Sequence, residues 1–249
     1  MADLDHAELL LLGDSIMSHL SRFPNIIGQR KVVNMCVPGQ KTTQLLDVLR
    51  SVNSPYSPKR IPFDHPYHHK NVRRIVIHIG TNDLNLPDLT AEDITDNIVD
   101  IITLVQNHIL KSSPDGSKAV CFLGLLPRNH KKDPPHYKET IKDINRRLKL
   151  MYQGQGIYIS PPKCLTNDKG CIQEEYYHTD KLHLSEEGLV QLFDCVARFV
   201  DRPLHHHVVM VYMTSEKFEE FRMRRLCRIR LDLPLLKWRD NRRWSDWVF

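Results

Sequence analysis

The stretch Glu8–Ser15, which reads ELLLLGDS, decides how this chain begins to fold. Its four consecutive leucines form a short apolar run that predicts a β-strand over Glu8–Gly13. Asp14 and Ser15 are residue types that start helices, because their side-chain oxygens accept hydrogen bonds from the first free backbone N–H groups. A strand, a sharp turn and a helix beginning at Ser15 are therefore expected. Ser15 would then lie at the carboxyl end of its strand, where open α/β sheets place their ligands.

The same alternation of strand and helix continues along the chain. Strands separated by helices form parallel sheets covered on both faces, and right-handed crossovers then give a three-layer α/β/α sandwich. The start of the third helix resembles a capping box, TAED at Thr90–Asp93. The segment Asn53–Lys70, rich in proline and histidine, predicts a long loop. Further strands are expected at Lys31–Cys36, Arg73–Ile79, Ala119–Leu125 and Gly156–Ile159, and further helices at Thr42–Val52, Ala91–Leu110, Pro134–Tyr152 and Ser185–Val200.

Composition and charge are those of an ordinary globular protein. The 249 residues carry a formal charge of +5, with 41% hydrophobic and 26% charged residues. No secretory leader precedes the first strand, and no apolar run approaches the roughly 20 residues of a membrane span. We therefore expect a cytoplasmic protein. The six cysteines fit no common zinc pattern, so reduced thiols are expected, although Cys164 and Cys171 flank one loop and leave a disulfide open.

Four polar segments follow apolar runs at widely separated places. They are Gly13–Ser15, Pro38–Gly39, Gly80–Asp83 and Asp180–His183. Taken singly, each segment is typical of an ordinary turn or helix cap. Taken together and in this order, they supply what acyl transfer to water requires: a nucleophile, donors for an oxyanion, and a base with an orienting carboxylate.

The chemistry of these side chains supports that combination. A serine hydroxyl is a weak nucleophile and needs a base, which His183 would provide. Asp180 lies three positions before His183, so that one turn brings the carboxylate to the imidazole Nδ1 and leaves Nε2 for Ser15. Asn82 offers an uncharged amide donor at the end of a strand, which suits an oxyanion.

The four segments together resemble the SGNH (GDSL-type) hydrolases, over roughly residues 5–202. The resemblance implies a flavodoxin-like, five-stranded parallel sheet and a serine esterase that needs neither metal nor cofactor. It also implies that Ser15 is the nucleophile, His183 the base and Asp180 its orienter. The oxyanion hole would consist of the Ser15 and Gly39 N–H groups and the Asn82 amide. The family includes esterases similar to platelet-activating-factor acetylhydrolase, and this implies a small-molecule or lipid ester as substrate.

Several alternatives stay open at this level. The sequence divides into a hydrolase domain over residues 1–203 and a basic extension over 204–249, which holds all three tryptophans and many arginines. A short-acyl esterase, a lysophospholipase or lipid esterase, and a retroelement-type protein whose basic extension binds nucleic acid all fit. After the fourth strand, Arg128, Asn129 and His130 are further candidates for contact with substrate. The oligomeric state is left undecided.

Overall fold

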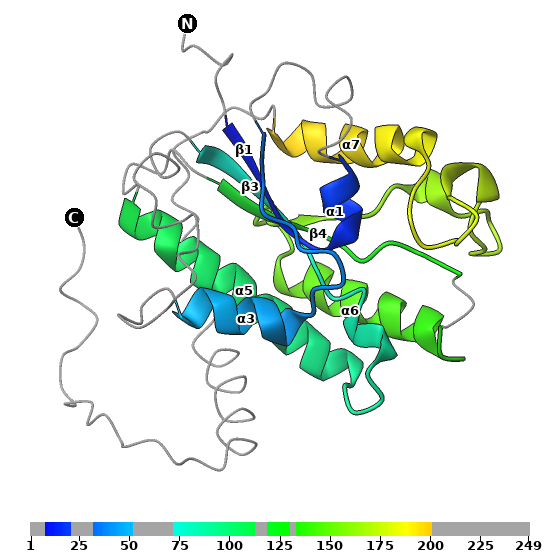
Figure 1. The fold of residues 1–249 in the computed structure, drawn as a ribbon, viewed down its shortest axis with the longest axis horizontal. Coiled ribbons are helices and arrows are strands. Elements are labelled where there is room, and N and C mark those ends of the chain that lie inside the picture. Colours follow the sequence, from blue (N-terminus) through cyan, green and yellow to red (C-terminus); the bar gives the residue numbers. More distant parts are fainter. Residues whose placement is uncertain (1–7, 21–31, 52–71, 113–118, 130–132, 201–249) are drawn as a thin grey trace, which may run out of the picture. The chain divides into compact units, whose positions relative to one another are not determined.

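The computed structural model describes residues 8–20, 32–51, 72–112, 119–129 and 133–200. Its centre is a five-stranded parallel sheet with the strand order β2-β1-β3-β4-β5 (Figure 1). The strands are β1 (Glu8–Gly13), β2 (Val32–Asn34), β3 (Val72–His78), β4 (Ala119–Leu123) and β5 (Tyr158–Ile159). The α-helices are α1 (Ser15–Leu20), α3 (Thr42–Ser51), α5 (Ala91–Ser112), α6 (Tyr137–Met151) and α7 (Glu186–Val200). This is the flavodoxin-like order that the resemblance implied, and the predicted fold class is confirmed.

Two apolar layers enclose the sheet, one on each face. On β1, Leu10 and Leu12 pack with residues of α3, α5 and α6, whereas Leu9 and Leu11 pack with residues of α1 and α7. Successive strand side chains point to opposite faces, so a run of leucines suits a strand that is buried on both. Figure 1 shows α1 and α7 on one side of the strands and α3, α5 and α6 on the other. The described part of the chain is thus a three-layer sandwich.

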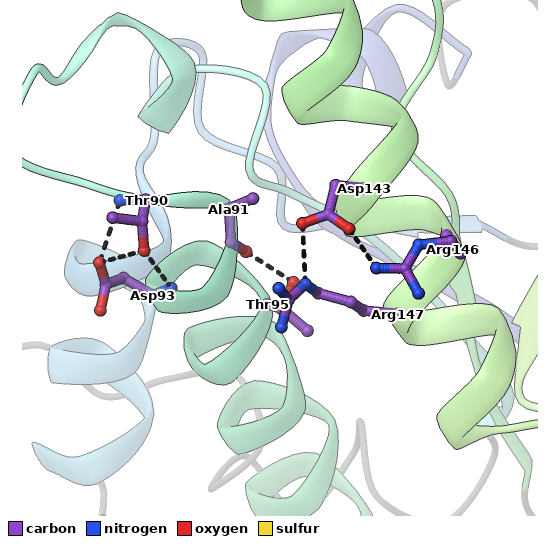
Figure 2. Close-up of polar contacts among 7 residues, drawn as sticks. All are labelled: Thr90, Ala91, Asp93, Thr95, Asp143, Arg146 and Arg147. Carbon is purple, nitrogen blue, oxygen red and sulfur yellow. Dashed lines mark hydrogen bonds and ion pairs between the residues drawn. The ribbon is translucent and has the colours of Figure 1, made fainter.

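Local side-chain interactions occur at the start of α5 and along α6. At the start of α5, the Thr90 N–H donates to Asp93 Oδ2 at 3.0 Å, and the Asp93 N–H donates to Thr90 Oγ1 at 3.2 Å (Figure 2). The predicted capping box is therefore confirmed. On α6, Asp143 forms ion pairs with Arg146 and Arg147, one turn further along the same helix (Figure 2). These ion pairs are exposed or half-buried, so they contribute little to stability compared with the buried faces.

The boundaries of several elements differ from the predicted ones. Helix α6 begins at Tyr137 rather than Pro134, and the Tyr137 N–H instead closes a turn onto the Pro134 carbonyl at 3.1 Å. Proline restricts the residue before it and lacks an N–H, so the pair at 134 and 135 delays the helix. Strand β2 ends at Asn34, two residues before the predicted end at Cys36. The predicted loop Asn53–Lys70 and the extension 204–249, for which nucleic-acid binding was one alternative, lie outside the described residues.

The strand order creates a switch point next to β1. The chain leaves β1 for β2 on one side and then returns to β3 on the other, so the crossovers after β1 and β2 run in opposite directions. In open α/β sheets a crevice forms at such a point, outside the carboxyl ends of the strands. The segments after β1, β2 and β3 all end at this edge, and they carry Ser15, Gly39 and Asn82.

Candidate active site

Ser15 is the first residue of α1, directly after a tight turn. The Asp14 N–H donates to the His78 carbonyl at 3.2 Å, and Asp14 Oδ1 accepts the Ile16 N–H at 3.1 Å. Gly13 has φ +145°, and a Cβ on it would lie 1.8 Å from the same His78 carbonyl oxygen. Only glycine allows this close approach of β1 to β3. The turn therefore determines where the Ser15 side chain emerges.

Three side chains from two distant segments form one hydrogen-bonded chain. Ser15 Oγ lies 3.0 Å from His183 Nε2, across 168 positions of sequence. His183 Nδ1 lies 2.6 Å from Asp180 Oδ2. A carboxylate only accepts hydrogen bonds, so Nδ1 carries the proton and Nε2 is the acceptor for the Ser15 hydroxyl. This is the tautomer that a general base beside a serine requires.

The orientation of Asp180 is set by its own backbone. Its other oxygen, Oδ1, accepts the N–H groups of Leu182 at 2.9 Å and His183 at 3.0 Å. Lys181, between them, takes the left-handed conformation with φ 54°. Partial burial acts to raise the pKa of Asp180, but these hydrogen bonds and the one to His183 outweigh it and bring the pKa to about 2. The carboxylate is therefore ionised at any pH near neutrality.

The segments after β2 and β3 are tied to each other. Asn82 Nδ2 donates to the Gln40 carbonyl at 3.0 Å, which orients the amide. An amide nitrogen has two hydrogens, so one remains available for a second acceptor. The buried Asp83 carboxylate accepts the Thr42 N–H at 3.0 Å and the Thr42 hydroxyl at 2.6 Å, at the beginning of α3. Gly39, directly before Gln40, is exposed and has φ +77°, where a side chain would strain the backbone.

Arg128 supports this edge rather than facing substrate. Its side chain is only 3% exposed and forms an ion pair with Asp133 at 2.5 Å. It also donates to the Thr81 carbonyl at 2.9 Å and to Asn85 Oδ1 at 3.3 Å. The terminal nitrogens of the guanidinium thus bond to protein groups, and these contacts give no support to Arg128 as a candidate for substrate contact. The ion pair joins two residues five positions apart between β4 and α6, and no helix or strand periodicity indicates it.

The neighbouring Asn129 is exposed, and its backbone N–H donates to the Lys181 carbonyl at 3.0 Å. The loop after β4 is thereby joined to the turn that carries Asp180 and His183. His130, the third candidate in this loop, lies outside the described residues.

His19 is a site residue that the sequence analysis did not single out. Its ring stacks on the His183 ring, with centroids 4.8 Å apart and planes inclined by 25°. The available signal was its position four residues after Ser15 in a helix, because such residues lie on the same helix face.

Cys36, the cysteine in the segment between β2 and Gly39, does not compete with Ser15 as a nucleophile. Cys36 follows β2, and its thiol has a pKa raised by burial and by the nearby Asp14 charge, so it stays protonated. Cys164 and Cys171 are free thiols, and Cys164 Sγ lies 3.5 Å from Gln191 Oε1.

Within the described residues, no three His, Cys, Asp or Glu side chains cluster so as to hold a metal ion. None of the helices in this part of the chain is long and apolar enough to cross a membrane.

Comparison with known proteins identifies the family to which the chain belongs. The sequence model of the GDSL-like lipase/acylhydrolase family matches residues 11–189, which include Ser15, Asn82, Asp180 and His183. The match covers more than half of the chain, which therefore belongs to this family of hydrolases. No protein with curated annotation matches the chain significantly.

Solved structures share the fold at low sequence identity. A Streptococcus pneumonia protein, described provisionally as a platelet activating factor, is 22% identical, with TM-score 0.58 over 78% of this chain and 84% of that one. The lipase Lip_vut3 from a goat rumen metagenome is 15% identical, with TM-score 0.56 over 80% and 100%. Est24, a carbohydrate acetylesterase from Sinorhizobium meliloti, is 15% identical, with TM-score 0.53 over 78% and 98%.

Proposed function

We propose that this protein is a serine esterase that hydrolyses a carboxylic ester of a short acyl group through an acyl-enzyme. The observation that carries the proposal is the continuous chain of hydrogen bonds from Ser15 through His183 to Asp180. A serine alone is a poor nucleophile, and a base held in the correct tautomer is the feature that changes this.

In the first half-reaction, Ser15 Oγ attacks the ester carbonyl carbon and its proton moves to His183 Nε2. The resulting oxyanion is stabilised by the Ser15 and Gly39 N–H groups and by the Asn82 amide. When the tetrahedral intermediate collapses, the bond to the alcohol oxygen breaks, and His183 returns the proton to that oxygen. Asp180 stabilises the imidazolium in between.

In the second half-reaction, water takes the place of the alcohol. His183 Nε2 accepts a proton from the water as its oxygen bonds to the acyl carbon. The second intermediate then collapses with rupture of the Ser15 Oγ–carbon bond, and the proton returns to Ser15. One ester and one water thus give one acid and one alcohol, without a cofactor.

The preference for a short acyl group rests on the surface around the site. Of the four clearly exposed large apolar side chains in the described residues, Val37 is the one in a site-forming segment, and it is 52% exposed. Its N–H donates to the Gly13 carbonyl at 2.8 Å, so the side chain is anchored between the first two site segments. Each buried methylene contributes about 0.8 kcal/mol. A single valine offers contact for a few carbons, whereas a long acyl chain needs an extended apolar surface.

The test is the hydrolysis of p-nitrophenyl esters from acetate to decanoate by the wild type, Ser15→Ala and Thr103→Ala. Thr103 is an exposed residue of α5 and serves as the matched control. We expect kcat/KM to be highest for acetate or butyrate, to be unchanged in Thr103→Ala, and to vanish in a folded Ser15→Ala. A maximum at octanoate or decanoate would instead support the lipid esterase. Hydrolysis that persists in Ser15→Ala would contradict the proposal.

A further inference from the structure

His19 covers one face of the imidazole that contacts Ser15. Ser15 and His19 are four residues apart in α1, so one helix turn carries both the hydroxyl and the stacked ring. The centroid distance of 4.8 Å and the inclination of 25° correspond to a stacked aromatic pair. The contact spans the same two segments as the Ser15–His183 hydrogen bond, but it uses the ring face instead of the ring edge.

The edge of the His183 ring is held at two points, and both are hydrogen bonds. Nδ1 is held by Asp180 at 2.6 Å and Nε2 by Ser15 at 3.0 Å. The His183 side chain is 24% exposed, so packing encloses it only in part. In the resting protein, two edge contacts and one face contact thus act on the orientation of the ring.

One of these contacts disappears during the proposed reaction. Once Ser15 is acylated, its Oγ is an ester oxygen that has no hydrogen to donate, and the bond to Nε2 is lost. The ring must nevertheless keep Nε2 aimed at the incoming water. At that stage the Asp180 carboxylate still holds Nδ1, and the His19 ring still covers one face.

We propose that His19 is a positioning residue that holds His183 in its productive orientation during hydrolysis of the acyl-enzyme. This inference rests on the proposed esterase function. His19 acts here through its aromatic face, so any flat aromatic side chain at this position preserves the effect. Its loss slows deacylation, whereas acylation, in which Ser15 still donates to Nε2, is nearly unaffected.

The kinetic test compares His19→Ala and His19→Phe with the wild type on p-nitrophenyl acetate. Stacking of an aromatic pair changes an equilibrium constant by up to about tenfold, so we expect kcat to fall about three- to tenfold in His19→Ala. KM should fall in parallel, leaving kcat/KM within about twofold, and a burst of p-nitrophenol should precede the slower steady state. His19→Phe should restore kcat to within about twofold of the wild type. His136→Ala, which removes an exposed histidine at the start of α6, is the control.

Two kinetic outcomes would overturn the inference. If kcat/KM falls as much as kcat in His19→Ala, the residue does not act selectively on deacylation. If His19→Phe is as slow as His19→Ala, stacking is not the property that matters. Thermal unfolding of each variant identifies one that has lost its fold.

A second measurement does not depend on activity and separates failure of this inference from failure of the esterase proposal. The Ser15→Ala variant lacks the hydroxyl, so its His183 ring has the same supports as in the acyl-enzyme. In this background, solvent exchange of the His183 Nδ1 proton is followed by NMR, with and without His19→Ala. We expect about tenfold faster exchange when the stack is removed. Equal exchange rates would refute the positioning role even if the wild type hydrolyses esters.

Discussion

Replacing Asp180 by asparagine tests the orientation of the proposed base most sharply. Two backbone N–H groups, of Leu182 and His183, both donate to Asp180 Oδ1. An asparagine has one carbonyl oxygen, and this must take the Oδ1 position. The opposite orientation would leave two N–H donors facing an NH₂ group, at a cost of about 1–3 kcal/mol each. The amide NH₂ therefore faces His183 Nδ1.

This arrangement reverses the tautomer of His183. Nδ1 must now accept a hydrogen bond, so the proton of the neutral ring moves to Nε2, which can no longer accept the Ser15 proton. In a Ser-His-Asp triad, the wrong tautomer lowers kcat by about 10⁴-fold. That corresponds to about 5 kcal/mol of transition-state stabilisation. Asp180→Ala carries no donor and leaves both tautomers accessible, so we expect it to be more active than Asp180→Asn.

The assay is steady-state hydrolysis of p-nitrophenyl acetate, with Asp168→Asn on an exposed loop as the matched control. Thermal unfolding establishes that the variants are folded. If Asp180→Asn retains activity within about tenfold of the wild type, the triad role of Asp180 is refuted. If kcat of Asp180→Asn equals or exceeds that of Asp180→Ala, the tautomer argument fails, even though both variants show that the carboxylate is needed.

The same carboxylate determines part of how folding stability and activity depend on pH. The pKa of Asp180 is about 2 in the folded protein, below its usual value of 3.8. Its contribution to stability is therefore complete above the usual value and is lost as the pH falls through about 2. Loss of activity between about pH 5 and 7, where histidines titrate, must then come from another group. Loss of activity at the usual carboxylate pKa of 3.8, in the wild type, would contradict the lowered pKa of Asp180.

Three further predictions concern the elements around the triad. Asn82→Ala should lower kcat for p-nitrophenyl acetate by about 10²–10³-fold with little change in KM, and an unchanged kcat would remove Asn82 from the oxyanion hole. Asp83→Ala should lower the free energy of unfolding by about 1–3 kcal/mol, because it leaves donors at the start of α3 unpaired. Chemical denaturation measures this, and Asp88→Ala, on an exposed turn, is the control that should have no effect. Gly13→Ala should abolish soluble protein because its Cβ would lie 1.8 Å from a backbone oxygen of β3. Gly154→Ala, where φ is +78° and the space is open, should lower the free energy of unfolding by only about 1–2 kcal/mol. Equal expression and thermal stability of the two variants would refute the close approach.

Local information in the sequence was sufficient for the elements and for the choice of candidate residues. The leucine run of β1, the apolar period of α5 and its capping box depend on neighbours within one turn or one strand, so they are readable in order along the chain. The same holds for Asp180 and His183, which share a single turn. Where local rules compete, as at the prolines before α6, the boundary moved by three residues.

Contacts between distant segments depended on the tertiary structure. Parallel strands show no local sign of which neighbour they pair with, so the order β2-β1-β3-β4-β5 and the switch point beside β1 arise only when the helical layers pack. The 3.0 Å contact between Ser15 and His183, the hydrogen bond from Arg128 to the segment after β3 and the stacking of His19 on His183 all join residues brought together by those crossovers. The sequence alone determined which chemical groups are present and that they end near one edge of the sheet. The packed fold decided which of them touch, because hydrogen bonds and ring contacts act over a few ångströms and depend on the full geometry of the sheet.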